Sequence, residues 1–156
     1  MRVRRALLLL GITLAIDGCA SSRMLLEDEM AKSNLQVVLA FEETVFNKHQ
    51  VREAFSRYVG STYKQHDPAV PDGRDAAIRA LDRVLGMQYP NARTVVKRTI
   101  ARGDYVWVQA LWEPRPGESR GEASVDIYRL ENARIVEHWG VVQAVPDQSA
   151  NDNTMF

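Results

Sequence analysis

The stretch Val125–Trp139, with the sequence VDIYRLENARIVEHW, decides how this chain is interpreted. It is typical of two amphipathic strands joined at Asn132-Ala133, with ionisable and aromatic side chains at every second position. Period-two alternation places such side chains on one face of a sheet. A sheet that carries Asp, His and Trp among Val and Ile is a candidate wall for a small-molecule pocket.

The direction in which these side chains point depends on the register of the two strands. A regular two-residue turn would pair Asp126 with Trp139 and Ile127 with His138, so Asp126 and His138 would face opposite ways. Ala133 suits such a turn poorly because the turn requires positive φ. A longer turn or a bulge is therefore the alternative, and it would change the register.

Sequence periodicity predicts helices first and strands afterwards. Apolar residues recur at three- and four-residue steps in three segments before Pro90, and the period then changes to two. A short extended segment over 61–66 separates the second and third helices. The order predicts an α+β class, with three N-terminal helices on one face of an antiparallel sheet. The expected helices cover 34–46, 51–59 and 77–85, and the expected long strands cover 94–102, 105–112, 122–131 and 134–143.

The first 19 residues have the pattern of an export signal. Arg2, Arg4 and Arg5 precede an apolar run over 6–16 that is too short for a permanent membrane span. The following Ile16-Asp17-Gly18-Cys19 resembles the lipobox of bacterial lipoproteins, in which the Cys is lipidated. An ordinary signal peptide cleaved elsewhere is the alternative. Residues 1–19 are thus interpreted as the signal, 20–33 as a polar tether, and 34–156 as one domain.

The composition of the chain after the signal excludes several classes of function. Removing three Arg and one Asp from 20 basic and 20 acidic side chains leaves 17 and 19, a net charge near −2. Nucleic acid is therefore an unsuitable partner, because phosphate binding needs a basic surface. Cys19 is the only cysteine, which excludes an internal disulfide and a thiol nucleophile after processing. The three His show no metal-ligand spacing, and no metal is expected.

Several separated motifs resemble those of one family. Tyr63-Lys64-Gln65-His66-Asp67-Pro68 is similar to a Y-x-Q-H-N-P segment, and Pro71-Asp72-Gly73-Arg74 to an x-D-G-R/K helix start. The ending Ser149–Phe156 is similar to S-A-N-x-N-T-M-F. Together with the Val125–Trp139 hairpin, they resemble the SnoaL-like polyketide cyclases of the nuclear transport factor 2-like superfamily. The ending is similar to a subgroup described as predicted aldol-condensation enzymes.

This resemblance implies a cone in which helices close a strongly curved sheet around a cavity, and it implies a homodimer formed through the sheet. It makes His66, Asp126 and His138 the candidate proton-transfer groups, with Tyr63 and Trp139 as ligand-binding residues. Members of the group usually have His-Trp-Asp where this chain has His138-Trp139-Gly140. Because Gly140 cannot transfer a proton, Asp126 is the substitute carboxylate that we predict.

Two functions follow from these expectations. The first is a lyase or isomerase without cofactor that enolises a small hydrophobic carbonyl compound. The second is a binding protein of the cell envelope that holds a small hydrophobic ligand without converting it. Lipid on Cys19 would anchor either protein, and Ala20 and Ser21 resemble residues that direct lipoproteins to an outer membrane facing the periplasm. Cleavage without lipidation would instead give a secreted periplasmic protein.

The export pattern makes one testable prediction. Cys19→Ser should move the protein from the membrane fraction to the soluble periplasmic or extracellular fraction, because the lipid anchor would be lost. Fractionation of cells that express wild type and variant, followed by immunoblotting, measures the change. Unaltered membrane association of the variant would contradict lipidation.

Overall fold

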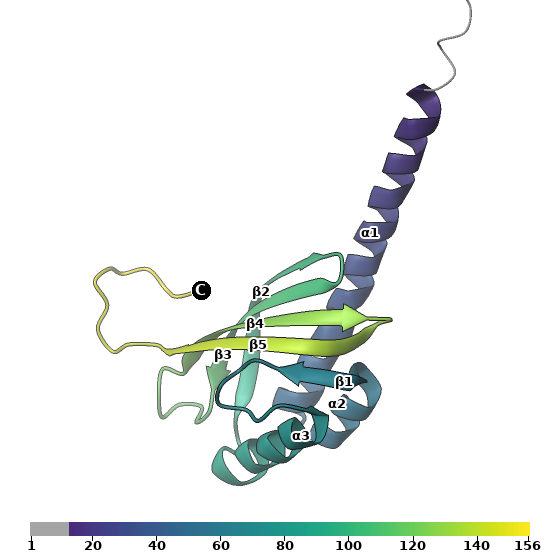
Figure 1. The fold of residues 1–156 in the computed structure, drawn as a ribbon. Helices are drawn as coiled ribbons and strands as arrows, with labels where there is room; N and C mark the ends of the chain where they lie inside the picture. Colours follow the sequence, from purple (N-terminus) through teal and green to yellow (C-terminus); the bar gives the residue numbers. More distant parts are fainter. Residues whose placement is uncertain (1–12) are drawn as a thin grey trace, which may run out of the picture.

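The computed structural model describes residues 13–156 and has helices on one side of a five-stranded sheet (Figure 1). This arrangement confirms the predicted α+β class with three helices on a curved, mainly antiparallel sheet. The α-helices are α1 (Thr13–Glu42), α2 (Val51–Tyr58) and α3 (Arg74–Arg83), with π-helical turns η1 (Glu43–Asn47) and η2 (Val84–Gln88). The strands are β1 (Val59–Gln65), β2 (Arg93–Arg102), β3 (Tyr105–Glu113), β4 (Glu122–Glu131) and β5 (Arg134–Ala144).

The sheet order is β1-β5-β4-β3-β2, with β1 parallel to β5 and all other pairs antiparallel. Alternation in β3 divides the two faces, since Val106 and Val108 are fully buried under the helices while Trp107 is 37% exposed on the outer face. The core combines this inner face with Val38 and Phe41 of α1 and Phe55 of α2. Burial of such apolar side chains is the main favourable term in folding.

Helix α1 extends well beyond the sheet in Figure 1, with its N-terminal half away from the rest of the chain. The predicted tether and the first predicted helix form one continuous helix, so the helix starts earlier than Asn34. Residues 22–30 are all exposed, and burial begins at Ala31. Cys19 lies within this helix, whereas the Arg residues of the signal pattern lie outside the described residues. Within residues 13–156, no helix combines the length and apolar character needed to span a membrane.

The hairpin of β4 and β5 contains both a tight turn and a bulge. Glu131 pairs with Arg134 around Asn132 and Ala133, whose φ angles are 50° and 56°, as a two-residue hairpin turn demands. Leu130 pairs with Ile135 but Arg129 pairs with Glu137, so Val136 is the extra residue of a β-bulge. The regular register predicted above is therefore wrong: Asp126 pairs with Gly140, and Tyr128 with His138.

The turn conformation can be tested directly. Ala133→Gly should raise the free energy of unfolding by up to about 1 kcal/mol, because a left-handed backbone is costly for an L-residue and free for glycine. Ala123→Gly, inside β4, is the matched control and should lower it by about 0.5–1 kcal/mol. Urea unfolding measures both. Equal losses from the two substitutions would show that Ala133 does not occupy a left-handed turn.

Candidate active site

The bulge in β5 places the candidate site on the helix side of the sheet. Beyond the bulge, His138 and Gly140 share one face of β5, and their pairing partners Tyr128 and Asp126 share the same face of β4. The His138 ring stacks on the Tyr128 ring, with 4.8 Å between centroids and 28° between planes. Two residues that the simple register would separate, Asp126 and His138, are thereby brought together.

His138 and Asp126 form a hydrogen-bonded pair. His138 Nε2 lies 3.1 Å from Asp126 Oδ1, and the side chains are only 12% and 17% exposed. The other ring nitrogen, Nδ1, lies 2.9 Å from Oε1 of Gln65. Gln65 reaches His138 because β1 runs beside β5, where the two residues are in register. We call His138 and Asp126 the dyad.

The hydrogen bonds of Gln65 determine where protons reside in the dyad. Its Oε1 accepts the backbone N–H of Asp67 at 2.9 Å, and its Nε2 donates to the Tyr63 hydroxyl at 2.9 Å. This fixes the amide orientation, so His138 Nδ1 must donate to Oε1. Nε2 and Asp126 Oδ1 can then be joined only by one further proton, carried by either partner. The hydrogen bond between His138 Nε2 and Asp126 Oδ1 therefore requires one proton, and it lies beside the Tyr128 ring.

Glu42 lies beneath the dyad and is the residue that the sequence analysis missed as a site residue. Its side chain projects from the end of α1, is 3% exposed, and accepts a short hydrogen bond from the Tyr128 hydroxyl. Burial, and secondly the charge of Asp126, raises the pKa of Glu42 to about 8. The signal was present in the sequence, since Glu42 stands on the apolar face of its helix.

Tyr63 lies in the same cluster, next to Gln65, and is almost fully buried. Burial, and then the charges of Asp126 and Asp67, raises the pKa of the Tyr63 hydroxyl well above its usual value. Burial, together with the charge of Glu42, likewise raises the pKa of Tyr128. Both phenols consequently stay protonated, and each can donate a hydrogen bond.

His66 and Trp139 are placed differently from the dyad. Trp139 alternates with His138 and Gly140 along β5, so it faces the outer side of the sheet. The His66 ring stacks on Trp139 at 4.6 Å and its Nε2 lies 2.8 Å from Glu137 Oε1. Arg129 donates to Glu137 at 2.7 Å, and this bond, more than His66, lowers the pKa of Glu137. The structure thus groups Tyr63, Asp126 and His138, and it places His66 and Trp139 in a separate outer cluster.

Gly140 lies directly beside the dyad. A Cβ atom at this position would lie 2.9 Å from Asp67 Oδ2, 3.4 Å from Asp126 Oδ1 and 3.4 Å from His138 Cε1. The glycine therefore lies among the polar side chains of Asp67, Asp126 and His138, and we call this cluster the Gly140 site. Among residues 13–156, no cluster of three or more His, Cys, Asp or Glu has an arrangement that could hold a metal ion.

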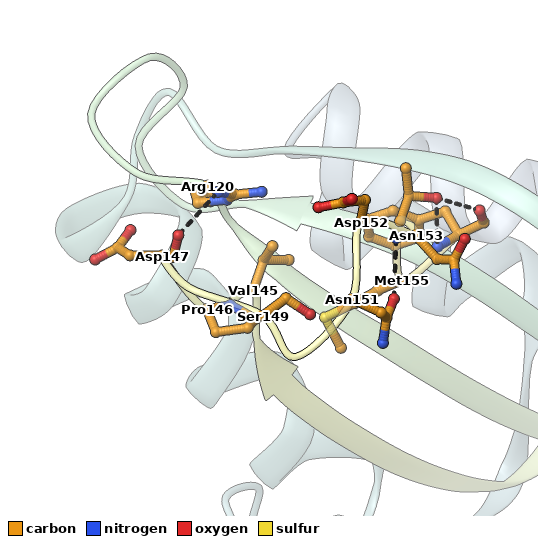
Figure 2. Close-up of a pocket in the computed structure, with 11 residues that line it drawn as sticks. Arg120, Val145, Pro146, Asp147, Ser149, Asn151, Asp152, Asn153 and Met155 are labelled. Atoms are coloured by element: carbon orange, nitrogen blue, oxygen red, sulfur yellow. Dashed lines mark hydrogen bonds between the residues drawn. The ribbon is translucent and has the colours of Figure 1, made fainter.

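Two cavities lie away from the Gly140 site. The larger, about 590 Å³, lies between Arg120 and the C-terminal tail, which curls back toward the sheet (Figures 1 and 2). Arg120 bonds the Asp147 carbonyl at 3.4 Å, and Gln109 donates to the Met155 carbonyl at 2.9 Å. The smaller, about 230 Å³, lies between Gln88–Asn91 and the loop around Arg115. Neither cavity is lined by the dyad.

Comparisons with known proteins agree with the fold. Residues 38–138 match the family described as the SnoaL-like domain. A candidate polyketide cyclase from Acidithiobacillus ferrooxidans is similar in structure, with 21% identity, a TM-score of 0.59, and coverage of 70% of this chain and 87% of that chain. An NTF2-like protein of unknown function from Mesorhizobium loti is 19% identical, with a TM-score of 0.60 and coverage of 73% of this chain and 93% of that chain. A candidate SnoaL-like polyketide cyclase from Jannaschia sp. CCS1 is 19% identical, with a TM-score of 0.58 and coverage of 72% of this chain and 87% of that chain. A comparison with curated proteins found no match.

The buried Glu42 predicts a pH-dependent stability. Between its usual pKa of 4.5 and about 8, Glu42 keeps a proton in the native state that the unfolded chain releases. The free energy of unfolding should therefore fall as pH rises through this window, because the native state binds more protons. Glu42→Gln should remove most of this slope, since the amide does not ionise.

The matched control for this experiment is Glu43→Gln, the exposed neighbour on the same helical segment. Urea unfolding of wild type and both variants at several pH values between 5 and 8 measures the slopes. A Glu42→Gln slope equal to those of wild type and Glu43→Gln would show that Glu42 ionises normally in the folded protein.

Proposed function

The chain belongs to the SnoaL-like domain family, and we propose that it is a cofactor-independent lyase or isomerase of the cyclase or aldol type. Its substrate would be a small hydrophobic carbonyl compound that is enolised beside the dyad. The observation that carries the proposal is the 3.1 Å contact between His138 Nε2 and Asp126 Oδ1, which one proton would join. Similar solved structures described as candidate polyketide cyclases support a reaction of this class.

The dyad has the properties that carbonyl enolisation needs from an acid. As the α-proton leaves, negative charge develops on the carbonyl oxygen, and a donor held nearby lowers the energy of that transition state. Partial exclusion of water strengthens this interaction, because the effective dielectric constant falls. The 12% and 17% exposure of the two side chains leaves a route for a substrate oxygen to reach them.

The neighbours of the dyad favour an apolar substrate. Tyr128 stacks on the His138 ring, and Tyr63 packs edge-on against Phe55 at 5.7 Å, so buried aromatic rings lie next to the Gly140 site. Aromatic surface binds planar conjugated carbonyl compounds through burial of apolar area. The alternative function, binding of a small hydrophobic ligand without conversion, would use the same rings but not the stored proton.

We also propose that the protein acts at the cell envelope and pairs with a second copy. Exposure of residues 22–30 supports the first, because this helical segment would separate a lipid on Cys19 from the folded domain. The apolar outer face of the sheet supports the second: Ile100 and Val141 are each 68% exposed, and Ile100 pairs with the exposed Trp107 of β3. Contiguous apolar surface of this kind is typical of protein contacts.

Exchange of the α-hydrogens of a ketone and 1,3-diketone panel in D₂O, followed by proton NMR, tests the catalytic proposal. Wild type should accelerate exchange of at least one compound. His138→Gln and Asp126→Asn should each reduce the rate by about 10²–10⁴-fold, because each removes the stored proton. His49→Gln, at a histidine bonded to the Ala92 carbonyl, is the matched control and should retain the wild-type rate.

The same panel separates the two functions. Binding of hydrophobic compounds by wild type, measured by calorimetry, without any exchange would favour the ligand-binding alternative. Exchange that survives in both His138→Gln and Asp126→Asn would show that the dyad is not the acid.

A further inference from the structure

We propose that Asp67 is the base of this site, and that Gly140 is glycine because the Asp67 carboxylate occupies the space of a side chain there. This inference rests on the proposed enolisation, and it adds the group that removes the proton from the substrate carbon. Asp67 lies in the loop after β1, far from β5 in sequence. It reaches Gly140 because β1 and β5 are adjacent strands.

The loop holds Asp67 in one orientation. Its backbone N–H donates to Gln65 Oε1 at 2.9 Å, the same oxygen that accepts His138 Nδ1. Its Oδ1 accepts the backbone N–H of Ala69 at 2.8 Å. Within the described part of the chain, Oδ2 is paired with no hydrogen-bond donor, and it is the oxygen that points at Gly140. One carboxylate oxygen is therefore structural, and the other is available to a substrate.

The geometry at Gly140 explains the glycine by space rather than by backbone conformation. The φ angle of Gly140 is outside the left-handed region, so an L-residue could adopt this backbone. A Cβ atom there would nevertheless lie 2.9 Å from Asp67 Oδ2, closer than Cβ contacts normally come. The chain also carries Asp67 where the similar motif has Asn, and Gly140 where it has Asp. Compared with that motif, the carboxylate is therefore in the loop after β1 rather than on β5.

The positions of the two carboxylates assign them different roles. Asp67 Oδ2 and Asp126 Oδ1 lie 2.9 Å and 3.4 Å from the same point, so the sum of these distances places them no more than about 6.3 Å apart. Asp126 Oδ1 is already engaged with His138 Nε2, whereas Asp67 Oδ2 has no hydrogen-bond donor among residues 13–156.

The reaction then balances without a further reagent. The substrate α-C–H bond breaks, its proton goes to Asp67 Oδ2, and its electron pair forms the enol C=C bond. The carbonyl oxygen takes the proton stored by the dyad, forming an O–H bond. Asp67 becomes neutral and the dyad loses one proton, so the total charge is conserved. Asp67 then returns its proton to the same or another carbon, and the enol O–H returns its proton to the dyad as the C=O bond re-forms, which completes an isomerisation.

Three variants test the assignment in the D₂O exchange assay. Asp67→Asn keeps the acceptor for the Ala69 N–H, so the loop should stay folded, but kcat should fall at least about 10²-fold with little change in KM. Asp75→Asn, an exposed carboxylate near the start of α3, is the matched control and should stay within a few-fold of wild type. Asp67→Asn/Gly140→Asp should recover at least tenfold relative to Asp67→Asn.

Thermal unfolding gives a second readout that does not depend on turnover. Gly140→Asp alone should lower Tm, because its Cβ and its charge would crowd Asp67 Oδ2. Adding Asp67→Asn should restore much of the loss, because the extra negative charge is removed. If the Tm change of the double variant equals the sum of the changes in the two single variants, the claim that Asp67 fills the space above Gly140 is overturned.

Each result of the two experiments has a defined meaning. If Asp67→Asn exchanges at the wild-type rate while His138→Gln is inactive, the proposed function stands and this inference falls. If the double variant recovers no activity, a carboxylate above position 140 is not the base. If wild type itself exchanges no compound, the proposed function fails, and the role of Asp67 as a base falls with it.

Discussion

One extra residue in β5 determines how the candidate site is assembled. Because Val136 bulges out of the pairing between β4 and β5, every side chain beyond it is shifted by one position relative to β4. Asp126, Tyr128, His138 and Gly140 then face the helices together. Without the bulge, His138 would face the opposite way from Asp126, and neither the dyad nor the Gly140 site would form.

Gln65 connects this hairpin to the first half of the chain. Its Oε1 accepts from both His138 Nδ1 and the Asp67 backbone, while its Nε2 donates to Tyr63. A single amide thereby fixes the tautomer of the histidine, the position of the loop carboxylate and the orientation of a buried phenol. Glu42 and Tyr128 form a second polar pair, which is buried in the core. Buried polar groups with complete partners hold a site rigid, whereas loss of one partner is costly.

The sequence was sufficient for the local structure and insufficient for the site. Helical periodicity and the later period of two predicted the elements because these patterns depend on residues close in the chain. The register failed because a bulge is decided by how the strand packs, although the positive φ of Ala133 agrees with the two-residue turn. Asp126, His138 and Tyr63, which the sequence singled out, lie together, whereas His66 was expected beside them and lies in the outer cluster. Glu42 was visible as an acid on an apolar helix face, whereas Asp67 becomes meaningful only once β1 lies beside β5.

The central claim is that the dyad stores a proton because His138 Nδ1 must donate to Gln65. Nitrogen-15 NMR of the His138 ring near neutral pH tests this most directly, since the chemical shifts report which ring nitrogen carries hydrogen. The account predicts a proton on Nδ1 at all times in the folded protein, and a proton between Nε2 and Asp126 that disappears in Asp126→Asn. A neutral ring protonated only on Nε2, with Nδ1 bare, would contradict it.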